Sequence, residues 1–164
     1  VVYIGTFSKV LFPALRVGYL VVPRPLWDAF LDARDALDVF SSTLYQLVLA
    51  EFLEEGHFAR HLRRMRGIYL RRRDAILEGL ARYCADVLTV VNADAGLHLP
   101  TLLENGQRDT AVLQRMTARG LTGVVLSKCY IGPTSRNGLL LGFGGFDERT
   151  LIAAMRTLGQ VLRH

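Results

Sequence analysis

The chain has 164 residues and is 51% hydrophobic, so it can bury one sizeable core. Its net charge of +5 comes mostly from arginine and permits acidic partners without identifying any. No run of eighteen apolar residues occurs, so no membrane-spanning segment is predicted, and Cys84 and Cys129 are too few for a disulfide framework. We therefore expect a cytoplasmic protein with reduced thiols.

The start of the chain carries no targeting signal. Residues 1–5 have no initiator methionine, no basic region and no signal-peptide cleavage pattern. We expect this sequence to come from the middle of a longer chain.

Two apolar stretches flank a polar loop near the beginning. Residues 1–4 have the pattern of a buried strand, and residues 15–22 that of a second strand. Lys9 lies in the loop between them, and the only other lysine is Lys128. A lysine held where water is scarce has a lowered pKa, and its neutral amine is the form that attacks a carbonyl.

The same loop offers groups that bind phosphate. Thr6 and Ser8 carry hydroxyls, and the guanidinium of Arg16 can bind a phosphate with two hydrogen bonds. A lysine that forms a Schiff base, together with phosphate donors, is the requirement of pyridoxal phosphate (PLP). The alternative is a buried loop lysine with a nearby arginine on a strand.

Three helices are predicted between residues 25 and 83. The first spans 25–38, the second begins at Ser41 or Ser42 and ends near Glu55 with Gly56 as its stop, and the third spans 57–83. The third helix is crowded with arginines: Arg60, Arg63, Arg64, Arg66, Arg71, Arg72 and Arg73. A solvated face with a few ion pairs is favoured over a nucleic-acid patch, because no groove-reading motif accompanies these arginines.

The remainder predicts a small α+β layer with its helices on one face. Strands are expected at 87–91, 96–99, 121–126 and 138–143, and helices at 109–119 and from Asp147 to about Leu162. Asp94, Asp109 and Asp147 are expected to be turn and cap residues.

The lysine loop resembles the signature of fold-type-I PLP enzymes, the aspartate aminotransferase superfamily. That signature reads Ser-x-Ser-Lys, a short spacer and Arg-x-Gly-Tyr, and this chain has Thr6-Phe7-Ser8-Lys9 and then Arg16-Val17-Gly18-Tyr19. The resemblance implies that Lys9 holds PLP as a Schiff base. It also implies that Thr6 and Arg16 bind the phosphate, with Ser8 beside them.

The same resemblance implies an α/β to α+β fold in three parts. Residues 1–56 would be the end of the large PLP-binding domain, 57–83 a long connecting helix, and 84–164 the small C-terminal α+β domain.

Three further segments resemble the MocR-type regulators of the GntR superfamily: residues 55–66, 95–99 and 138–143. This resemblance implies a homodimer that binds PLP, senses a small amine or amino acid and regulates transcription. It implies DNA binding only through an N-terminal winged helix-turn-helix, which this sequence does not contain.

One position departs from the pattern of true aminotransferases. In those enzymes an arginine on the strand near the C-terminus holds the substrate carboxylate, and Leu140 stands at that position here. A leucine cannot pair a carboxylate, and leaving a buried carboxylate unpaired is costly. Arg136 replaces the missing arginine only if its loop folds back. The sequence therefore favours a sensor over transamination of ordinary amino acids.

The histidines are weaker candidates. His98 lies where the family places a side chain near the cofactor pocket, so it is a candidate effector contact, although a hydrogen-bonded structural histidine is the favoured alternative. His57 and His61 have the spacing of a zinc pair, but no third ligand accompanies them, so no metal site is predicted.

Three hypotheses remain open. The first is a PLP-binding, effector-sensing and dimerisation domain of a MocR-type regulator, the second is a PLP-dependent aminotransferase, and the third is a structural domain that has lost the cofactor. The carboxylate for the pyridine nitrogen and the stacking aromatic ring cannot be assigned in this sequence. We therefore expect this chain alone to be inactive and to expose apolar surface.

Overall fold

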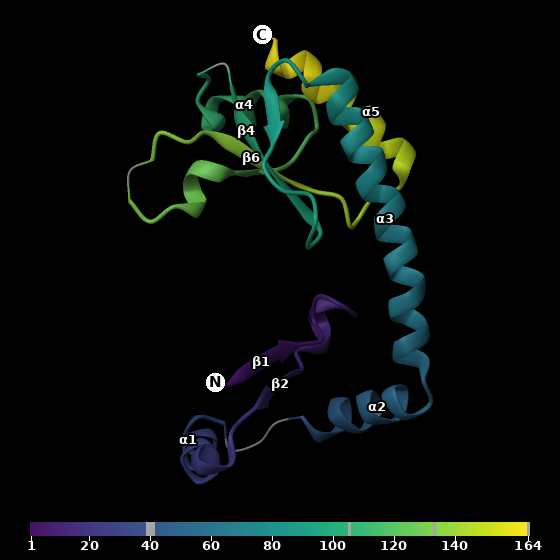
Figure 1. The fold of residues 1–164 in the computed structure, drawn as a ribbon, viewed down its shortest axis with the longest axis vertical. Helices are drawn as coiled ribbons and strands as arrows, with labels where there is room; N and C mark the ends of the chain where they lie inside the picture. Colours follow the sequence, from purple (N-terminus) through teal and green to yellow (C-terminus); the bar gives the residue numbers. More distant parts are fainter. Residues whose placement is uncertain (39–41, 105, 133, 164) are drawn as a thin grey trace. The chain divides into compact units, whose positions relative to one another are not determined.

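In a computed structural model, the protein is described over residues 1–38, 42–104, 106–132 and 134–163 (Figure 1). The chain divides into two compact units, Val1–Arg64 and Met65–His164, which we call the first and the second unit. None of the helices in the described ranges is long and apolar enough to cross a membrane.

The first unit begins with a two-stranded antiparallel hairpin. Strand β1 (Tyr3–Thr6) pairs with β2 (Gly18–Val21), and the register sets Tyr3 opposite Val21 and Thr6 opposite Gly18. Helices α1 (Trp27–Leu37) and α2 (Thr43–Glu54) follow, and α1 is preceded by a 3₁₀ turn at Arg24–Leu26. The indole N–H of Trp27 donates to the Val22 carbonyl oxygen at 2.8 Å, which ties the start of α1 to the end of β2.

The prediction that the first strand is buried is wrong for this chain. Tyr3 and Ile4 are 58% and 74% exposed, and only Leu15 and Leu49 are buried among the described residues of the first unit. A two-stranded hairpin has no second layer of its own to cover its faces. The apolar side chains of both strands, together with those of α1 and α2, therefore form the exposed apolar surface that the sequence predicts.

The second helix begins and ends where the sequence indicates, but its cap differs. Ser42 occupies the N-cap position of α2, yet its side chain makes no capping hydrogen bond, and Ser41 lies outside the described residues. Gly56 ends the segment with a φ of 73°, a left-handed conformation that glycine adopts at little cost. Because Gly56 turns the chain here, the next helix starts at once.

Helix α3 (His57–Tyr83) has the predicted bounds, and it begins in the first unit and continues into the second. Its buried residues, Ala75, Ile76, Gly79 and Leu80, lie on one face. On its exposed side Arg71 pairs with Glu148 at 3.2 Å and Arg73 with Asp74 at 3.1 Å. These pairs agree with a solvated face that carries a few surface ion pairs.

The second unit is built on a four-stranded antiparallel sheet in the order β3-β4-β6-β5. The strands are β3 (Leu88–Val90), β4 (His98–Leu103), β5 (Val124–Val125) and β6 (Gly138–Gly142). Helices α4 (Asp109–Ala118) and α5 (Glu148–Leu162) complete it, with α5 running beside α3 in Figure 1. Strand β5 is shorter than the predicted 121–126: residues 121–123 are not in a strand, and a 3₁₀ turn at Leu126–Cys129 ends β5 after Val125.

One face of this sheet forms the core. The pairs Leu99–Leu141 and Thr101–Leu139 are buried. The three leucines join a hydrophobic cluster with residues of all three helices, among them Ile76, Val112 and Leu158. Side chains alternate between the two faces of a strand, so the intervening residues lie on the other face. We call this other face, with His98, Pro100, Leu102, Val124 and Leu140, the open face.

The three aspartates have different roles. Asp147 caps α5 as predicted: its carboxylate accepts the Thr150 N–H at 2.7 Å, and this hydrogen bond lowers the pKa of Asp147. Asp94 lies in a turn, where its own N–H donates to the Asn92 side-chain oxygen at 2.7 Å.

Asp109 is not a cap or turn residue, so that prediction is wrong. Its carboxylate is 1% exposed and accepts hydrogen bonds from the Ser127 N–H and hydroxyl, both at 2.8 Å, and from the Gly138 N–H at 3.3 Å. These contacts bind the 3₁₀ turn after β5 and the start of β6 to the first turn of α4. The three hydrogen bonds replace the water that a buried carboxylate loses.

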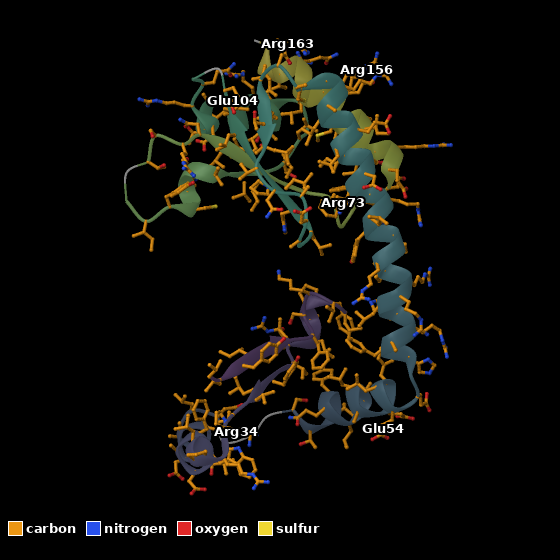
Figure 2. All side chains as sticks on the ribbon, viewed as in Figure 1. Arg34, Glu54, Arg73, Glu104, Arg156 and Arg163 are labelled. Atoms are coloured by element: carbon orange, nitrogen blue, oxygen red, sulfur yellow. The ribbon has the colours of Figure 1, made fainter. Side chains whose placement is uncertain are left out.

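Arg163 joins the C-terminal ends of two helices, and Figure 2 labels it at the end of α5. Its guanidinium donates to the Tyr83 and Gly159 carbonyl oxygens at 3.0 and 3.1 Å and pairs with Asp86 at 3.1 Å. Carbonyls in the last turn of a helix have no partner within the helix, and a basic side chain satisfies them.

We predict that Gly159→Ala destabilises the second unit by about 1–3 kcal/mol, the usual range for overpacking. A Cβ at this position would strike the Tyr83 carbonyl oxygen, which is backbone and cannot rotate away. Alanine raises helix propensity by about 1 kcal/mol, which offsets only part of the loss. Chemical denaturation measures the effect. The matched control is Gly145→Ala, because a Cβ there meets open space, and an equal response of the two variants would contradict the packing argument.

We predict that the two thiols react at very different rates. Burial raises the pKa of Cys84 to about 11, and Cys129 is exposed. At pH 8 roughly one Cys84 thiol in a thousand is ionised, and the thiolate is the nucleophile. Iodoacetamide should label Cys129 first and Cys84 only on unfolding. Because the pKa of Cys84 is higher in the folded state, its contribution to stability should be lost as the pH rises from about 9 to about 11.

Candidate functional site

The hairpin of the first unit brings the predicted site residues to one end. The register ends with Thr6 opposite Gly18, and the Phe7 N–H then donates to the Val17 carbonyl oxygen at 3.1 Å. This bond closes the base of a loop at residues 7–17. Thr6 and Arg16 therefore lie beside the two sides of its base, although they are far apart in the sequence, and Ser8 and Lys9 start the loop.

Backbone hydrogen bonds shape the chain around Lys9. The Ser8 N–H donates to the Thr6 hydroxyl oxygen at 3.2 Å, and the Leu11 N–H donates to the Phe7 carbonyl oxygen at 2.9 Å. The second bond closes a single turn that contains Lys9. Thr6 uses an oxygen lone pair in the first bond, so its hydroxyl proton is still available to donate to an anion.

Arg16 has an unusual backbone conformation. It is the one non-glycine residue with positive φ in the described ranges, at 51°, and it directly follows the buried Leu15. A side chain in the left-handed region costs about 1–2 kcal/mol. Such strain gathers at functional sites, so it supports a role for the arginine.

A polar hollow of about 520 Å³ lies beside Arg16. Its lining is Leu15, Arg16, Val17, Gly18, Arg34, Ser42, Tyr45 and Gln46. Thr6, Ser8 and Lys9 are not among these residues. The four predicted residues therefore lie at the same end of the hairpin, but only Arg16 lines this hollow.

Lys9 is exposed, which corrects the expectation of a dry setting. The apolar residues on either side of the loop do not close over its amine, because the strands that carry them are themselves exposed. The described chain therefore supplies the position of the amine but does not bury it.

Two contacts from the start of α3 reach this loop, and no pattern in the sequence indicates them. The ring of Phe58 meets that of Phe7 edge to face at 5.7 Å, and His61 Nε2 lies 2.8 Å from the Val10 carbonyl oxygen. The partners are about fifty positions apart, and the partner of His61 is a backbone atom, so no residue spacing encodes the contact. Phe7 also packs on Tyr19 at 5.5 Å.

The histidine pair does not form a metal site. His57 Nε2 contacts the Glu55 carboxylate at 2.8 Å, while His61 turns to Val10. Within the described ranges there is no group of three or more histidine, cysteine, aspartate or glutamate side chains that could hold a metal.

The donor set of the loop fits two ends of PLP. An accessible primary amine suits the aldehyde, and a threonine hydroxyl with a guanidinium suits the phosphate. No residue of the described chain can be assigned to the pyridine nitrogen. The residues present therefore fit the aldehyde and phosphate ends of the cofactor.

The second unit places His98 and Leu140 on the same open face. His98 pairs with Gly142, and Leu140 lies between Pro100 and Val124 on the neighbouring strands. The imidazole of His98 lies over Gly142, because a Cβ there would come within 3.3 Å of the ring. His98 is exposed and has no hydrogen bond among the described residues, so the favoured alternative of a hydrogen-bonded structural histidine is wrong.

Arg136 lies at the other end of β6. The Asn137 carbonyl oxygen accepts the Leu103 N–H at 2.9 Å, so the strand pairing continues back to residue 137. At about 3.3 Å per residue, the two ends of β6 are on the order of 13 Å apart. Arg136 therefore lies just before one end of β6, whereas His98 pairs with Gly142 at the other end.

Comparison with known proteins matches these features to one family. The model for "Aminotransferase class I and II" matches residues 1–136. The chain belongs to this family. Its members are typically PLP-dependent, and the loop with Lys9 and Arg16 lies within the matched region.

The relatives include regulators and enzymes. The chain is 35% identical over 158 residues to the probable rhizopine catabolism regulatory protein MocR of Rhizobium meliloti, and 32% identical over 150 residues to the pyridoxine biosynthesis transcriptional regulator PdxR of Corynebacterium glutamicum. These alignments cover 96% and 92% of this chain. The chain spans about a third of the length of these curated relatives, 32% of each.

Among solved structures, the chain resembles the α-aminoadipate aminotransferase LysN of Thermus thermophilus. The TM-score is 0.89 at 26% identity, and the match covers 99% of this chain and 41% of the other. The fold is therefore the fold-type-I aminotransferase fold, in its C-terminal part, as the sequence predicts. The LysN structure contains N-(5'-phosphopyridoxyl)-L-leucine.

Proposed function

We propose that this chain is the PLP-binding, effector-sensing and dimerisation part of a MocR-type transcriptional regulator. In this proposal Lys9 binds PLP as a Schiff base, and Thr6, Ser8 and Arg16 bind its phosphate. Residues 1–56 form the end of the large PLP-binding domain, 57–83 the connecting helix and 84–164 the small domain.

The lysine loop supports PLP binding. It gathers a primary amine, two hydroxyls and a guanidinium at one end of a hairpin whose register is set by backbone hydrogen bonds. When bound, PLP supplies a reactive aldehyde and an electron sink. The chain's own residues supply the amine and hold the phosphate, and Arg16 carries most of that charge pairing because it can bind two phosphate oxygens.

The presence of Leu140 is the main reason for proposing a sensor rather than an enzyme. It lies in the middle of β6, where the superfamily pattern has a carboxylate-binding arginine, and its cross-strand neighbours are Pro100 and Val124. None of these three side chains can pair with a carboxylate. A substrate held by that arginine in an enzyme would lose a charge-assisted contact here.

The relatives add support for a regulatory role. The two regulators are 35% and 32% identical to this chain, whereas LysN is 26% identical. By analogy with regulators of this type, DNA would be bound by a winged helix-turn-helix outside this chain. The effector would be a small amine or amino acid that meets the open face near His98.

The alternative is a PLP-dependent aminotransferase acting on an amino acid. The likeness to LysN at a TM-score of 0.89 favours it, because the scaffold of a working transaminase is retained. In that case another cation has to take the place of the missing arginine.

We predict that Arg16→Ala weakens PLP binding by about 1.5–3 kcal/mol, the value of a hydrogen bond to a charged group. Absorbance titration of the full-length protein with PLP measures the affinity. The matched control is Arg24→Ala, because Arg24 belongs to the same unit but lies over the Trp27 ring at 5.8 Å. Equal affinity of Arg16→Ala and the unchanged protein would contradict the phosphate role.

We predict that the PLP-loaded protein reacts slowly with ordinary amino acids, because Leu140 leaves their carboxylate unpaired. A panel of amino acids is mixed with the loaded protein, and conversion to pyridoxamine phosphate is followed by absorbance. Leu140→Arg should speed this conversion relative to Leu140→Met, a control of similar volume. Rapid conversion by the unchanged protein would favour the enzyme.

A further inference from the structure

We infer that His61 is a positioning residue for Lys9: its hydrogen bond to Val10 holds the lysine loop on the first turns of α3. This inference rests on the proposed function, in which Lys9 binds PLP. Both contacting residues belong to the first unit, as does the loop.

Two contacts bracket the lysine. Before Lys9, the Phe7 ring packs edge to face on Phe58 at 5.7 Å. After it, the Val10 carbonyl oxygen lies 2.8 Å from His61 Nε2. Phe58 and His61 are three positions apart, so they lie on the same face of α3. The backbone of Lys9 is therefore fixed on both sides by one helix face.

The hydrogen bond has a defined direction. A carbonyl oxygen can only accept, so Nε2 of His61 donates. The neutral ring with its proton on Nε2 and the doubly protonated ring both provide this donor. In either form Nε2 already carries its proton in this contact, so it is not free to take a proton from Lys9. This assigns His61 a positioning role rather than proton transfer.

The loop depends on such contacts because packing does little for it. Lys9 and Val10 are exposed, and Leu15 is the one buried residue among 7–17. A reacting group that is misplaced by a small distance loses rate steeply. A loop released from α3 would present the amine in many orientations, and few of them would suit the aldehyde.

The experiment compares His61→Ala and His61→Gln in the full-length protein. The glutamine amide keeps a donor at a similar reach, so it separates loss of the hydrogen bond from loss of the ring. The matched control is His57→Ala, one helical turn earlier, whose ring contacts Glu55 and Arg60 instead of the loop. Lys9→Ala provides the blank for uptake of PLP.

Two quantities are measured. The first is the rate at which added PLP develops the absorbance of the lysine adduct. The second is amide hydrogen exchange at Leu11 without PLP, because that N–H closes the turn around Lys9. We expect His61→Ala to slow uptake and to speed exchange, each roughly three- to tenfold, the effect of one net hydrogen bond. His61→Gln and His57→Ala should stay within about twofold of the unchanged protein.

Equal values for His61→Ala and His57→Ala in both measurements would overturn the inference, and so would a glutamine variant as impaired as the alanine variant. If Lys9→Ala takes up PLP as fast as the unchanged protein, the proposed function fails instead. In that case only the amide hydrogen exchange at Leu11 tests the positioning role of His61. An exchange rate in His61→Ala equal to that of the unchanged protein would overturn this role.

Discussion

The candidate site depends on the backbone hydrogen bond from Phe7 to Val17 that closes the base of the lysine loop. It extends a hairpin register in which Thr6 already faces Gly18. With the base closed, Lys9 and Arg16 belong to one loop of fixed length, and the hydroxyl of Thr6 lies beside its base. Without it, they would be separate groups on two apolar segments. The left-handed backbone at Arg16 is the local consequence of returning the chain to β2 after the 3₁₀ turn at Pro13–Leu15.

In the second unit, the helices cover one face of the sheet and leave the other face open. Helices α3, α4 and α5 contribute to the core on the other face, and small residues let them approach: at Gly79 a Cβ would lie 2.8 Å from Met155 Cβ. The buried carboxylate of Asp109 then fixes the chain at both Ser127 and Gly138. As a result the start of β6 is held to the turn that follows β5. Leu140 and His98 lie on the face of the sheet that the helices leave uncovered.

The sequence predicts those features of the fold that depend on residues close together in the chain. The bounds of α3 follow from Gly56 and a long helical repeat, and the cap of α5 follows from Asp147 placed three residues before Thr150. The signature that joins Lys9 to Arg16 indicates that both belong to one hairpin. The predicted second strand at 15–22 includes Arg16, however, and β2 begins only at Gly18. The sequence indicates the four strands of the second unit but not all of their bounds: the strand expected at 96–99 is β4 at His98–Leu103.

What the sequence could not predict depends on distant partners. Burial of β1 is one example, because an apolar run shows that a strand can be buried but not what covers it. Asp109 is another, because its partners Ser127 and Gly138 come together only in the folded sheet. The contact of His61 with Val10 is a third, since a backbone oxygen leaves no mark in the sequence.

The most direct test of the account is to find which lysine carries the cofactor. The full-length protein is incubated with PLP, reduced with borohydride, digested and mapped by mass spectrometry. The account predicts a reduced adduct on Lys9 that is absent from Lys9→Ala. An adduct on Lys128, or one that persists unchanged in Lys9→Ala, would contradict it.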